Sequence, residues 1–325
     1  MILVTSAAGG VGRALVKDLH ARGAQVRAFV KNDSQAELSR GDGATEVVVG
    51  DIESCTDLAR AASGVRVVFH ATPTSIVNEL ALARSLVEAT RASDVEHVVY
   101  HSVIHPEITE MFHHQEKLRV EGIIRESGIP FTFLRASHFM QNYLDFWEFL
   151  LAGTLPYPTS PDQLMGVVDV EDVAEASALV LTAPEGHRAQ TYDLSAHELT
   201  RREMAVVWSR VLGHPVSAVR LPPSVVQNPL HAVSAVAPIL ARSLLSTKLG
   251  GLPHVLRGMQ DSSNARGVRK WSPESRECYR RMMEYYDGHG LPAGDMAVLP
   301  RLLGRNATTY EQFARREATR RVASR

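Results

Sequence analysis

The sequence predicts an α/β fold in which helices cover both faces of a doubly wound parallel sheet. Strand-like and helix-like patterns alternate up to Phe139, which is typical of parallel strands joined by helices. After Phe139 the rhythm changes, and proline-rich breaks at 156–161 and 221–223 interrupt a more helical stretch. We therefore expect a sheet domain over residues 1–155 and a smaller, mainly helical region over 156–325 that partly returns to the sheet.

Short runs rich in β-branched residues predict six strands, at residues 2–5, 25–30, 46–50, 65–70, 96–101 and 131–135. The patterns between them predict helices at 11–22, 35–40, 56–62, 78–92 and 114–127. In the first helix Val11, Leu15 and Leu19 lie on one apolar stripe, which we expect to pack on the sheet. A further strand at 190–195 is expected to return to the sheet.

The composition is that of an ordinary globular protein. The chain has 325 residues, of which 45% are hydrophobic and 22% are charged, and its formal net charge is −1. This balance gives no overall field that would attract nucleic acid or an anionic membrane. Cys55 and Cys278 are the two cysteines, and no His or Cys stands near them at metal-ligand spacing. We therefore expect neither a disulfide framework nor a metal site.

Two apolar stretches bear on where the protein acts. Met1 is followed directly by apolar residues, without the basic segment of a secretory signal, so we expect a cytoplasmic protein. The stretch at 229–245 contains His231, Pro238 and Arg242, so it is too short and too interrupted to span a bilayer. We expect a buried helix or a lid there.

A glycine-rich turn joins the first predicted strand to the first predicted helix. In "VTSAAGGVG" the residues Ser6, Gly9 and Gly12 have the spacing G-x-x-G-x-x-G, with serine at the first glycine position. Backbone N–H groups of such a turn and of the helix N-terminus can approach a pyrophosphate, although glycine turns also occur for structural reasons. The turn predicts a Rossmann-type dinucleotide site, whose candidate residues are Ser6, Ala8, Gly9, Gly10, Val11 and Gly12. Ser6 should be tolerated if its φ is negative, and its hydroxyl could contact a phosphate.

The end of the second strand indicates which dinucleotide binds. An acidic residue there would bind the ribose 2′-OH of NAD, and a basic residue would accept the 2′-phosphate of NADP. Lys31 stands at this place, nineteen residues after Gly12, and Arg13 is a second candidate cation. We favour NADP(H) over NAD(H); the alternative is that Lys31 is a solvated loop lysine and Asp33 binds the ribose.

Two later strand ends complete the predicted cofactor site. Asp51 and Ile52 follow the third strand, where they would contact the adenine edge. Ala71 and Thr72 follow the fourth strand and would line the path towards the nicotinamide.

Most of the chain resembles the NmrA-like family of atypical short-chain dehydrogenases. The resemblance rests on "TSAAGGVG", "VRAFVKND", "VVVGDIES", "HVVYHSV", "HHQEKLRVEGIIRESGIPFTFLRASHFMQN", "VVDVEDVAEASALVL" and "LLGRNATTYEQFARRE". The family includes NADP-dependent quinone and dye reductases, isoflavone-type reductases and non-catalytic redox sensors. The motifs are specific to the family and not to one activity within it.

The resemblance implies a proton-transfer pair on the helix after strand five. Related dehydrogenases carry Tyr-x-x-x-Lys there; this chain has His113 at the tyrosine position and Lys117 at the lysine position, on one helix face. The alternatives are an exposed Lys117–Glu121 pair and a polar helix start for His113 and its neighbour His114. Ser102 matches the family's serine after strand five, or serves only as a cap.

The segment 135–147 follows strand six, where open sheets leave a crevice. His138 and Asn142 could contact a planar substrate, beside an apolar wall that includes Phe139 and Tyr143. Core packing is the alternative explanation for these aromatic residues.

Together these features predict hydride transfer from NADPH to a small planar acceptor, such as a quinone, an enone or an aromatic ketone. Lys117 is the first candidate for proton donor and His113 the second. A redox sensor without turnover, and an isomerase or cyclase on the same fold, are the alternatives. We expect a small aromatic or quinone-like molecule as the partner, and a monomer or a homodimer.

Overall fold

The computed structural model divides the chain into two compact units that alternate along the sequence. It describes residues 1–73, 75, 78–93, 95–228, 231, 238–241, 251–264, 268 and 270–323. The sheet unit consists of Met1–Ser137, Val170–Leu194 and Gly294–Ala307, and the second unit of His138–Asp169, Ser195–Ala293 and Thr308–Arg325. The chain thus first enters the second unit at His138, before the expected boundary at 155, and then returns twice to the sheet unit.

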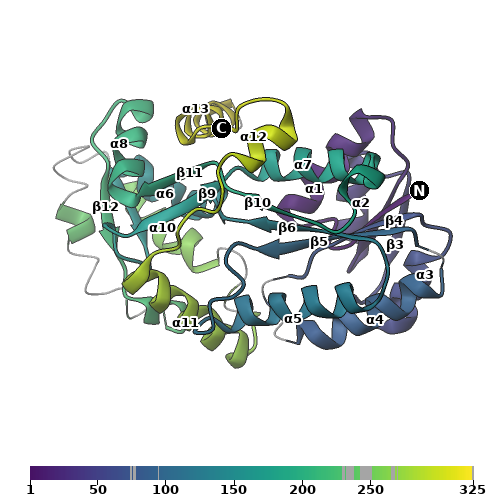
Figure 1. Cartoon of the computed structure of the whole chain (residues 1–325). Coiled ribbons are helices and arrows are strands. Elements are labelled where there is room, and N and C mark those ends of the chain that lie inside the picture. Colours follow the sequence, from purple (N-terminus) through teal and green to yellow (C-terminus); the bar gives the residue numbers. More distant parts are fainter. Residues whose placement is uncertain are drawn as a thin grey trace. The chain divides into compact units, whose positions relative to one another are not determined.

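The sheet unit is built on seven parallel strands in the order β10-β6-β5-β4-β1-β2-β3 (Figure 1). The strands are β1 (Ile2–Val4), β2 (Val26–Val30), β3 (Glu46–Val49), β4 (Val67–His70), β5 (His97–Val103), β6 (Phe131–Ala136) and β10 (Gln190–Leu194). The six predicted strands and the returning strand are confirmed. The order reverses between β1 and β4, the position at which open parallel sheets leave a crevice beyond their carboxyl ends.

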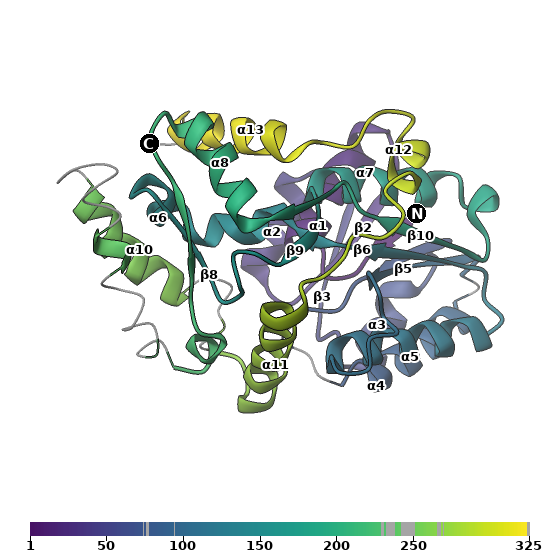
Figure 2. The same cartoon turned by 60° about the vertical axis from the view of Figure 1, so that its left-hand side comes forward.

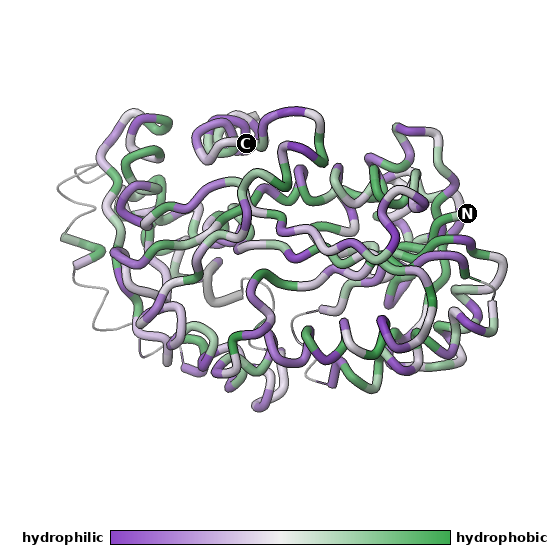
Figure 3. Tube along the Cα trace, in the orientation of Figure 1, coloured by the Kyte–Doolittle hydropathy of each residue, from purple (hydrophilic) through white to green (hydrophobic). Residues whose placement is uncertain are grey.

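Helices cover both faces of this sheet, with α3, α4 and α5 on one side and α1 and α7 on the other (Figure 1). Their bounds are α1 (Gly10–Ala21), α2 (Asp33–Gly41), α3 (Cys55–Ala62), α4 (Glu79–Arg91), α5 (Phe112–Glu126), α7 (Val170–Thr182), η2 (Pro184–His187) and α12 (Val298–Leu303). The five predicted helices are confirmed. Val11, Leu15 and Leu19 are buried as the stripe predicted, and Figure 3 shows hydrophobic strands beside helices that alternate in hydropathy.

The second unit is mainly helical, but its described residues include five short strands that the sequence analysis did not predict. Its helices are η1 (Met140–Phe146), α6 (Trp147–Leu151), α8 (Arg201–Leu212), η3 (Pro223–Val226), α10 (Leu252–Asn264), α11 (Pro273–His289) and α13 (Tyr310–Ala323). One sheet joins β7 (His138–Phe139), β9 (Leu164–Val168) and β11 (His197–Thr200); another joins β8 (Thr154–Tyr157) and β12 (Ser217–Arg220). Figure 2 shows α13 beside α8, where Trp208 donates to the Tyr310 hydroxyl.

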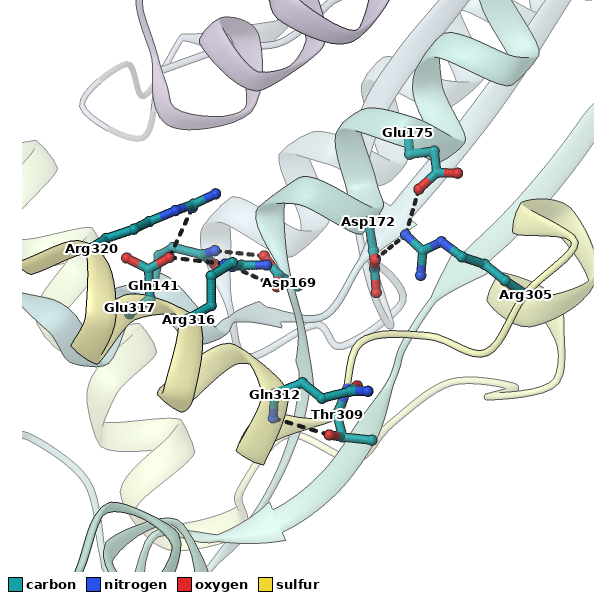
Figure 4. Close-up of polar contacts among 10 residues, drawn as sticks. All are labelled: Gln141, Asp169, Asp172, Glu175, Arg305, Thr309, Gln312, Arg316, Glu317 and Arg320. Atoms are coloured by element: carbon teal, nitrogen blue, oxygen red, sulfur yellow. Dashed lines mark hydrogen bonds and ion pairs between the residues drawn. The ribbon is translucent and has the colours of Figure 1, made fainter. Parts of the chain in front are cut away.

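Arginines near the C-terminus are paired within each unit (Figure 4). In the sheet unit Arg305 donates to Asp172 of α7 at 2.7 Å and also contacts Glu175. In the second unit Arg316 of α13 lies 2.8 Å from Asp169, which also accepts a hydrogen bond from Gln141 at 2.7 Å. The basic C-terminal helix is therefore attached to its unit by ion pairs.

The stretch at 229–245 lies mostly outside the described residues, so the helix or lid expected there stays a prediction. Within the described part of the chain, no helix has both the length and the apolar content needed to cross a bilayer.

A buried arginine joins the two strands of the smaller sheet. Arg201, the first residue of α8, is 1% exposed and donates to the carbonyls of Leu155 at 2.9 Å, Val219 at 2.6 Å and Thr159. Burial lowers its pKa to about 10, which keeps the guanidinium charged at neutral pH. A single cation thus satisfies three backbone acceptors from β8, β12 and the adjoining segment.

Replacing Arg201 by methionine should lower the free energy of unfolding by about 3 kcal/mol, because the buried carbonyls would lose their donors. Urea denaturation measures this loss. The neighbouring Arg202→Met is the matched control, since Arg202 and its partner Asp162 are 63% and 62% exposed, and such a pair contributes about 1 kcal/mol or less. Equal losses in the two variants would contradict this interpretation.

Candidate functional site

The N-terminus of α1 lies at the end of the glycine-rich turn and has no side-chain cap among the described residues. Gly9 is the N-cap residue, and the first turn of α1 carries no acidic residue. Asn32 caps α2 and Ser54 caps α3 through their side chains, whereas α4 and α5, like α1, have no side-chain cap among the described residues. The first N–H groups of α1 and its positive dipole end are therefore available to an anion.

Gly12 and Gly10 differ in whether the fold requires glycine at their positions. A Cβ on Gly12 would lie 2.4 Å from the Ser6 carbonyl oxygen and 2.8 Å from the Ala7 Cα, so only glycine allows α1 to approach the turn so closely. A Cβ on Gly10 would meet nothing within 4 Å, and its φ is outside the left-handed region. The fold alone does not require glycine at position 10, whereas the close approach of a diphosphate would.

Ser6, at the first glycine position of the motif, has an unusual backbone conformation. Its φ is +52°, in the left-handed region that favours glycine, so the condition of a negative φ is not met. The hydroxyl donates to the Ala71 carbonyl at 2.8 Å, and Thr5 Oγ1 accepts from the Ala71 N–H at 3.1 Å. These bonds hold the strained turn against the end of β4. The predicted cofactor residues Ser6 and Ala71 therefore lie together, with half-buried Thr72 next along the chain.

The two candidate cations for a 2′-phosphate have different surroundings. Lys31 follows β2 and is exposed, and no ion pair of its side chain is found among the described residues. Arg13 instead donates to Asp42 at 2.6 and 2.9 Å. The Arg13 hydrogen bond, with a smaller contribution from Lys17, lowers the pKa of the Asp42 carboxyl. Asp42 thus already neutralises the charge of Arg13, so Lys31 is the better candidate for binding the 2′-phosphate.

The segment after β3 forms an ordered turn. Asp51 Oδ1 accepts from the Glu53 N–H at 3.0 Å, and the Asp51 N–H donates to Asp57 at 2.9 Å. The Asp51 side chain is exposed, and Ile52 packs partly against the core. Both predicted adenine contacts therefore lie at the carboxyl end of β3, as expected.

Lys117 is held by two buried groups from other elements. Its Nζ donates to Glu79 Oε2 at 3.0 Å and lies 3.4 Å from the Tyr100 hydroxyl, which itself donates to Glu79 Oε2 at 3.2 Å. Glu79 is 2% exposed and Tyr100 fully buried, whereas the Lys117 side chain keeps 15% exposure. The alternative of an exposed Lys117–Glu121 pair is wrong, because the fully buried Glu121 pairs with Arg135 at 2.6 Å.

Ser102 is part of the Glu121–Arg135 pair and not of the Lys117 contacts. Its hydroxyl donates to Glu121 Oε1 at 2.7 Å, and Ser102 is buried on β5. The hydroxyl proton is thus already engaged by a carboxylate that α5 presents to β5 and β6.

Neutral imidazoles lie around the charged lysine. His113, one turn before Lys117, is 6% exposed, and its Nε2 has no hydrogen-bond partner in the part of the chain that the structure describes. Burial lowers its pKa, and so does the positive charge of Lys117. Burial likewise lowers the pKa of His70 to about 3 and that of His114 to about 4. Because both are buried, His113 and His114 are not a polar helix start.

These residues fit a nicotinamide dinucleotide. The uncapped end of α1 suits its diphosphate, the unpaired His113 Nε2 suits a polar group of the ligand, and Lys117 carries a charge on a partly exposed side chain. The carboxyl ends of β1 and β4 and the start of α5 lie at one edge of the parallel sheet.

The predicted substrate residues belong to the second unit, where two of them meet. His138 Nε2 lies 3.1 Å from both the Tyr157 hydroxyl and Asn142 Nδ2. Tyr143 is buried, with its ring 4.9 Å from that of Tyr157, so it serves the core of this unit. Phe139 and Asn142 are half-buried, which leaves them better placed to contact a ligand.

Sequence reasoning missed Glu79 and Tyr100. Tyr100 lies in the predicted strand five, and Glu79 is the first residue of α4. The helix dipole alone explains an acidic residue in the first turn of a helix, so the position of Glu79 in the sequence does not indicate a functional role.

The chain is similar to named reductases over most of its length. The chain is 32% identical over 288 residues to a Streptomyces griseus protein named (4-alkanoyl-5-oxo-2,5-dihydrofuran-3-yl)methyl phosphate reductase, covering 86% of this chain and 99% of that one. It is 24% identical over 258 residues to quinone oxidoreductase 2 of Escherichia coli, covering 78% and 90%.

Among solved structures, the triphenylmethane reductase of Citrobacter sp. complexed with NADP(H) superposes with a TM-score of 0.72 at 22% identity, covering 98% of this chain and 99% of that one. This likeness shows the fold. The sequence profile of the NmrA-like family matches residues 1–244, and the chain belongs to the NmrA-like family.

Proposed function

We propose that this protein is an NADPH-dependent reductase that transfers hydride to an enone or quinone. The observation that carries the proposal is the N-terminus of α1, which has no side-chain cap and begins at Gly10. A Cβ at position 10 would meet nothing within 4 Å, so the fold itself does not require glycine there. When bound, the nicotinamide supplies the hydride. The chain's own residues bind the dinucleotide, exclude water and stabilise the charge that forms on the acceptor.

Most of the predicted cofactor residues have a part in this proposal; the side chains of Ser6 and Arg13 are engaged with Ala71 and Asp42. The backbone of residues 8–12 would hold the diphosphate, Lys31 the 2′-phosphate, and Asp51 with Ile52 the adenine edge. Ala71 and Thr72 would line the approach to the nicotinamide, and Lys117 would contact the adjoining ribose.

An enone is the acceptor class that the relatives favour. The substrate named for the Streptomyces griseus reductase contains an unsaturated lactone ring, and the Escherichia coli relative is named for quinones. In both classes the carbon that accepts hydride is conjugated to a carbonyl oxygen, on which negative charge develops. Lys117 is the first candidate to stabilise this charge or donate the proton, and His113 the second. His138, Phe139 and Asn142 are the proposed substrate contacts.

One feature favours a second function. His113 stands where related dehydrogenases have tyrosine, and a redox sensor needs no proton donor. A sensor would bind NADP(H) without turnover, and an isomerase or cyclase would leave the nucleotide unchanged.

Gly10→Ala should raise the Kd of NADPH about tenfold or more while leaving the thermal stability nearly unchanged, because its Cβ meets only the space proposed for the diphosphate. Titration calorimetry measures the affinity. Gly122→Ala is the control, since this Cβ in α5 also meets nothing within 4 Å and lies outside the turn. Equal NADPH affinity in both variants would argue against a dinucleotide on this turn.

Lys31→Ala should weaken NADPH binding about tenfold and leave NADH binding unchanged, because only NADPH carries the 2′-phosphate. The difference should shrink at high salt. Lys270→Ala, another exposed lysine, serves as the control. Equal losses for the two nucleotides would refute the assignment of Lys31.

Lys117→Met should lower kcat about a hundredfold when NADPH oxidation is followed with an acyl butenolide and a quinone. Arg119→Met on the same helix is the control, because Arg119 is 60% exposed. If the wild-type protein binds NADPH but oxidises it with neither acceptor, the reductase proposal fails and the sensor takes its place.

A further inference from the structure

We propose that Glu79 is a positioning residue for Lys117, with Tyr100 as its second support. This inference rests on the proposed function, since it concerns the lysine of that site. It assigns a role to two residues outside the helix on which the family's proton-transfer pair stands.

The first argument is the geometry of a single oxygen. Glu79 Oε2 accepts both from Lys117 Nζ at 3.0 Å and from the Tyr100 hydroxyl at 3.2 Å, and Nζ and the hydroxyl lie 3.4 Å apart. The three polar atoms form a closed triangle that joins α4, α5 and β5. The ammonium group of Lys117 is therefore fixed from two sides, and its third N–H is left for a ligand.

The second argument is the cost of the arrangement. Glu79 is 2% exposed, and an ion pair only partly regains the free energy that burying a carboxylate costs. If position 79 only filled space in the core, an apolar side chain would pack there equally well. Three features offset the cost here: the Lys117 charge, the Tyr100 proton and the N-terminal end of α4, where Glu79 is the first residue.

The third argument is the difference between Lys117 and the other buried pair nearby. Arg135 binds Glu121 through two parallel hydrogen bonds at 2.9 and 2.6 Å, which suits a purely structural link. Lys117 meets its carboxylate through one bond, which leaves capacity for a ligand.

Tyr100 takes part without touching substrate. It is fully buried, and burial raises its pKa well above the ordinary value for tyrosine, as does the nearby Glu79 carboxylate. It therefore remains a neutral phenol that donates to Glu79. A phenol thus lies beside the lysine although the tyrosine position on α5 is occupied by His113, but it supports the lysine and is no proton donor to the acceptor.

The test is a double-mutant cycle of Glu79→Gln and Lys117→Met. Glu79→Gln keeps the shape of the side chain and removes the charge, so we expect the Kd of NADPH to rise about tenfold and kcat with the acyl butenolide to fall at least tenfold. If Glu79 acts through Lys117, then Glu79→Gln should change either quantity by less than about twofold in the Lys117→Met background. A merely structural carboxylate would give the same loss in both backgrounds.

Glu116→Gln is the matched control, because Glu116 is 4% exposed on α5 but pairs with Arg119. It should leave Kd and kcat within about twofold of wild type. If Glu79→Gln fails to fold, Tyr100→Phe serves instead, because it removes only the Tyr100 hydroxyl. This variant should raise the Kd of NADPH when Lys117 is present and should leave the Kd unchanged in the Lys117→Met background. An unchanged Kd in Glu79→Gln, or equal effects in both backgrounds, would overturn the inference.

The affinity measurement separates this inference from the proposed function. If the wild-type protein binds NADPH without turnover, the reductase proposal fails. The double-mutant cycle can then still be measured on the Kd of NADPH, and it still decides whether Glu79 acts through Lys117.

Discussion

The close packing of α1 on the turn after β1 is the constraint on which the site depends. Only a hydrogen fits at Gly12, because a Cβ would lie 2.4 Å from the Ser6 carbonyl oxygen. The helix therefore begins at Gly10, directly after the turn, and no side chain of the described residues caps it. The left-handed backbone of Ser6 costs about 1 kcal/mol or more, which its hydrogen bond to Ala71 partly offsets. The turn is thereby joined to the end of β4, at the sheet edge where α5 begins.

Buried carboxylates in the sheet unit pair with several cations, and the number of hydrogen bonds to each cation differs between them. Glu121 fixes Arg135 and Ser102 inside the unit, and Asp42 holds Arg13 on its surface. Glu79 holds Lys117 through a single bond, among histidines that burial keeps neutral, whereas Lys17, which also contacts Asp42, is 59% exposed. The site therefore has one concentrated positive charge in a poorly solvated region, where an electrostatic interaction with a developing anion is strongest.

Local patterns predicted most of the sheet unit, because each strand and helix there has a clear hydrophobic period. The strands of the second unit were missed, since they have two to five residues, too few to show a period. The partners of Lys117 were missed for another reason. Glu79 and Lys117 are 38 residues apart, and only the packing of α4 on α5 brings them together. The i, i+4 spacing of Lys117 and Glu121 indicated a pair, but burial directs the two side chains to different partners. The φ of Ser6 likewise depends on β4, which no local pattern encodes.

The residue at position 113 bears on the kind of acceptor that this site can reduce. Hydride addition to a simple ketone produces an alkoxide, a strong base that needs a proton donor held in place, and this is the task of the tyrosine in related dehydrogenases. Hydride addition to an enone or a quinone produces an enolate or a hydroquinone anion, in which the charge is delocalised and the base is weaker. A fixed ammonium group can stabilise such an anion until a proton arrives from water or from Lys117 itself. A neutral, buried His113 beside Lys117 therefore supports the proposal that this protein reduces conjugated acceptors and not simple ketones.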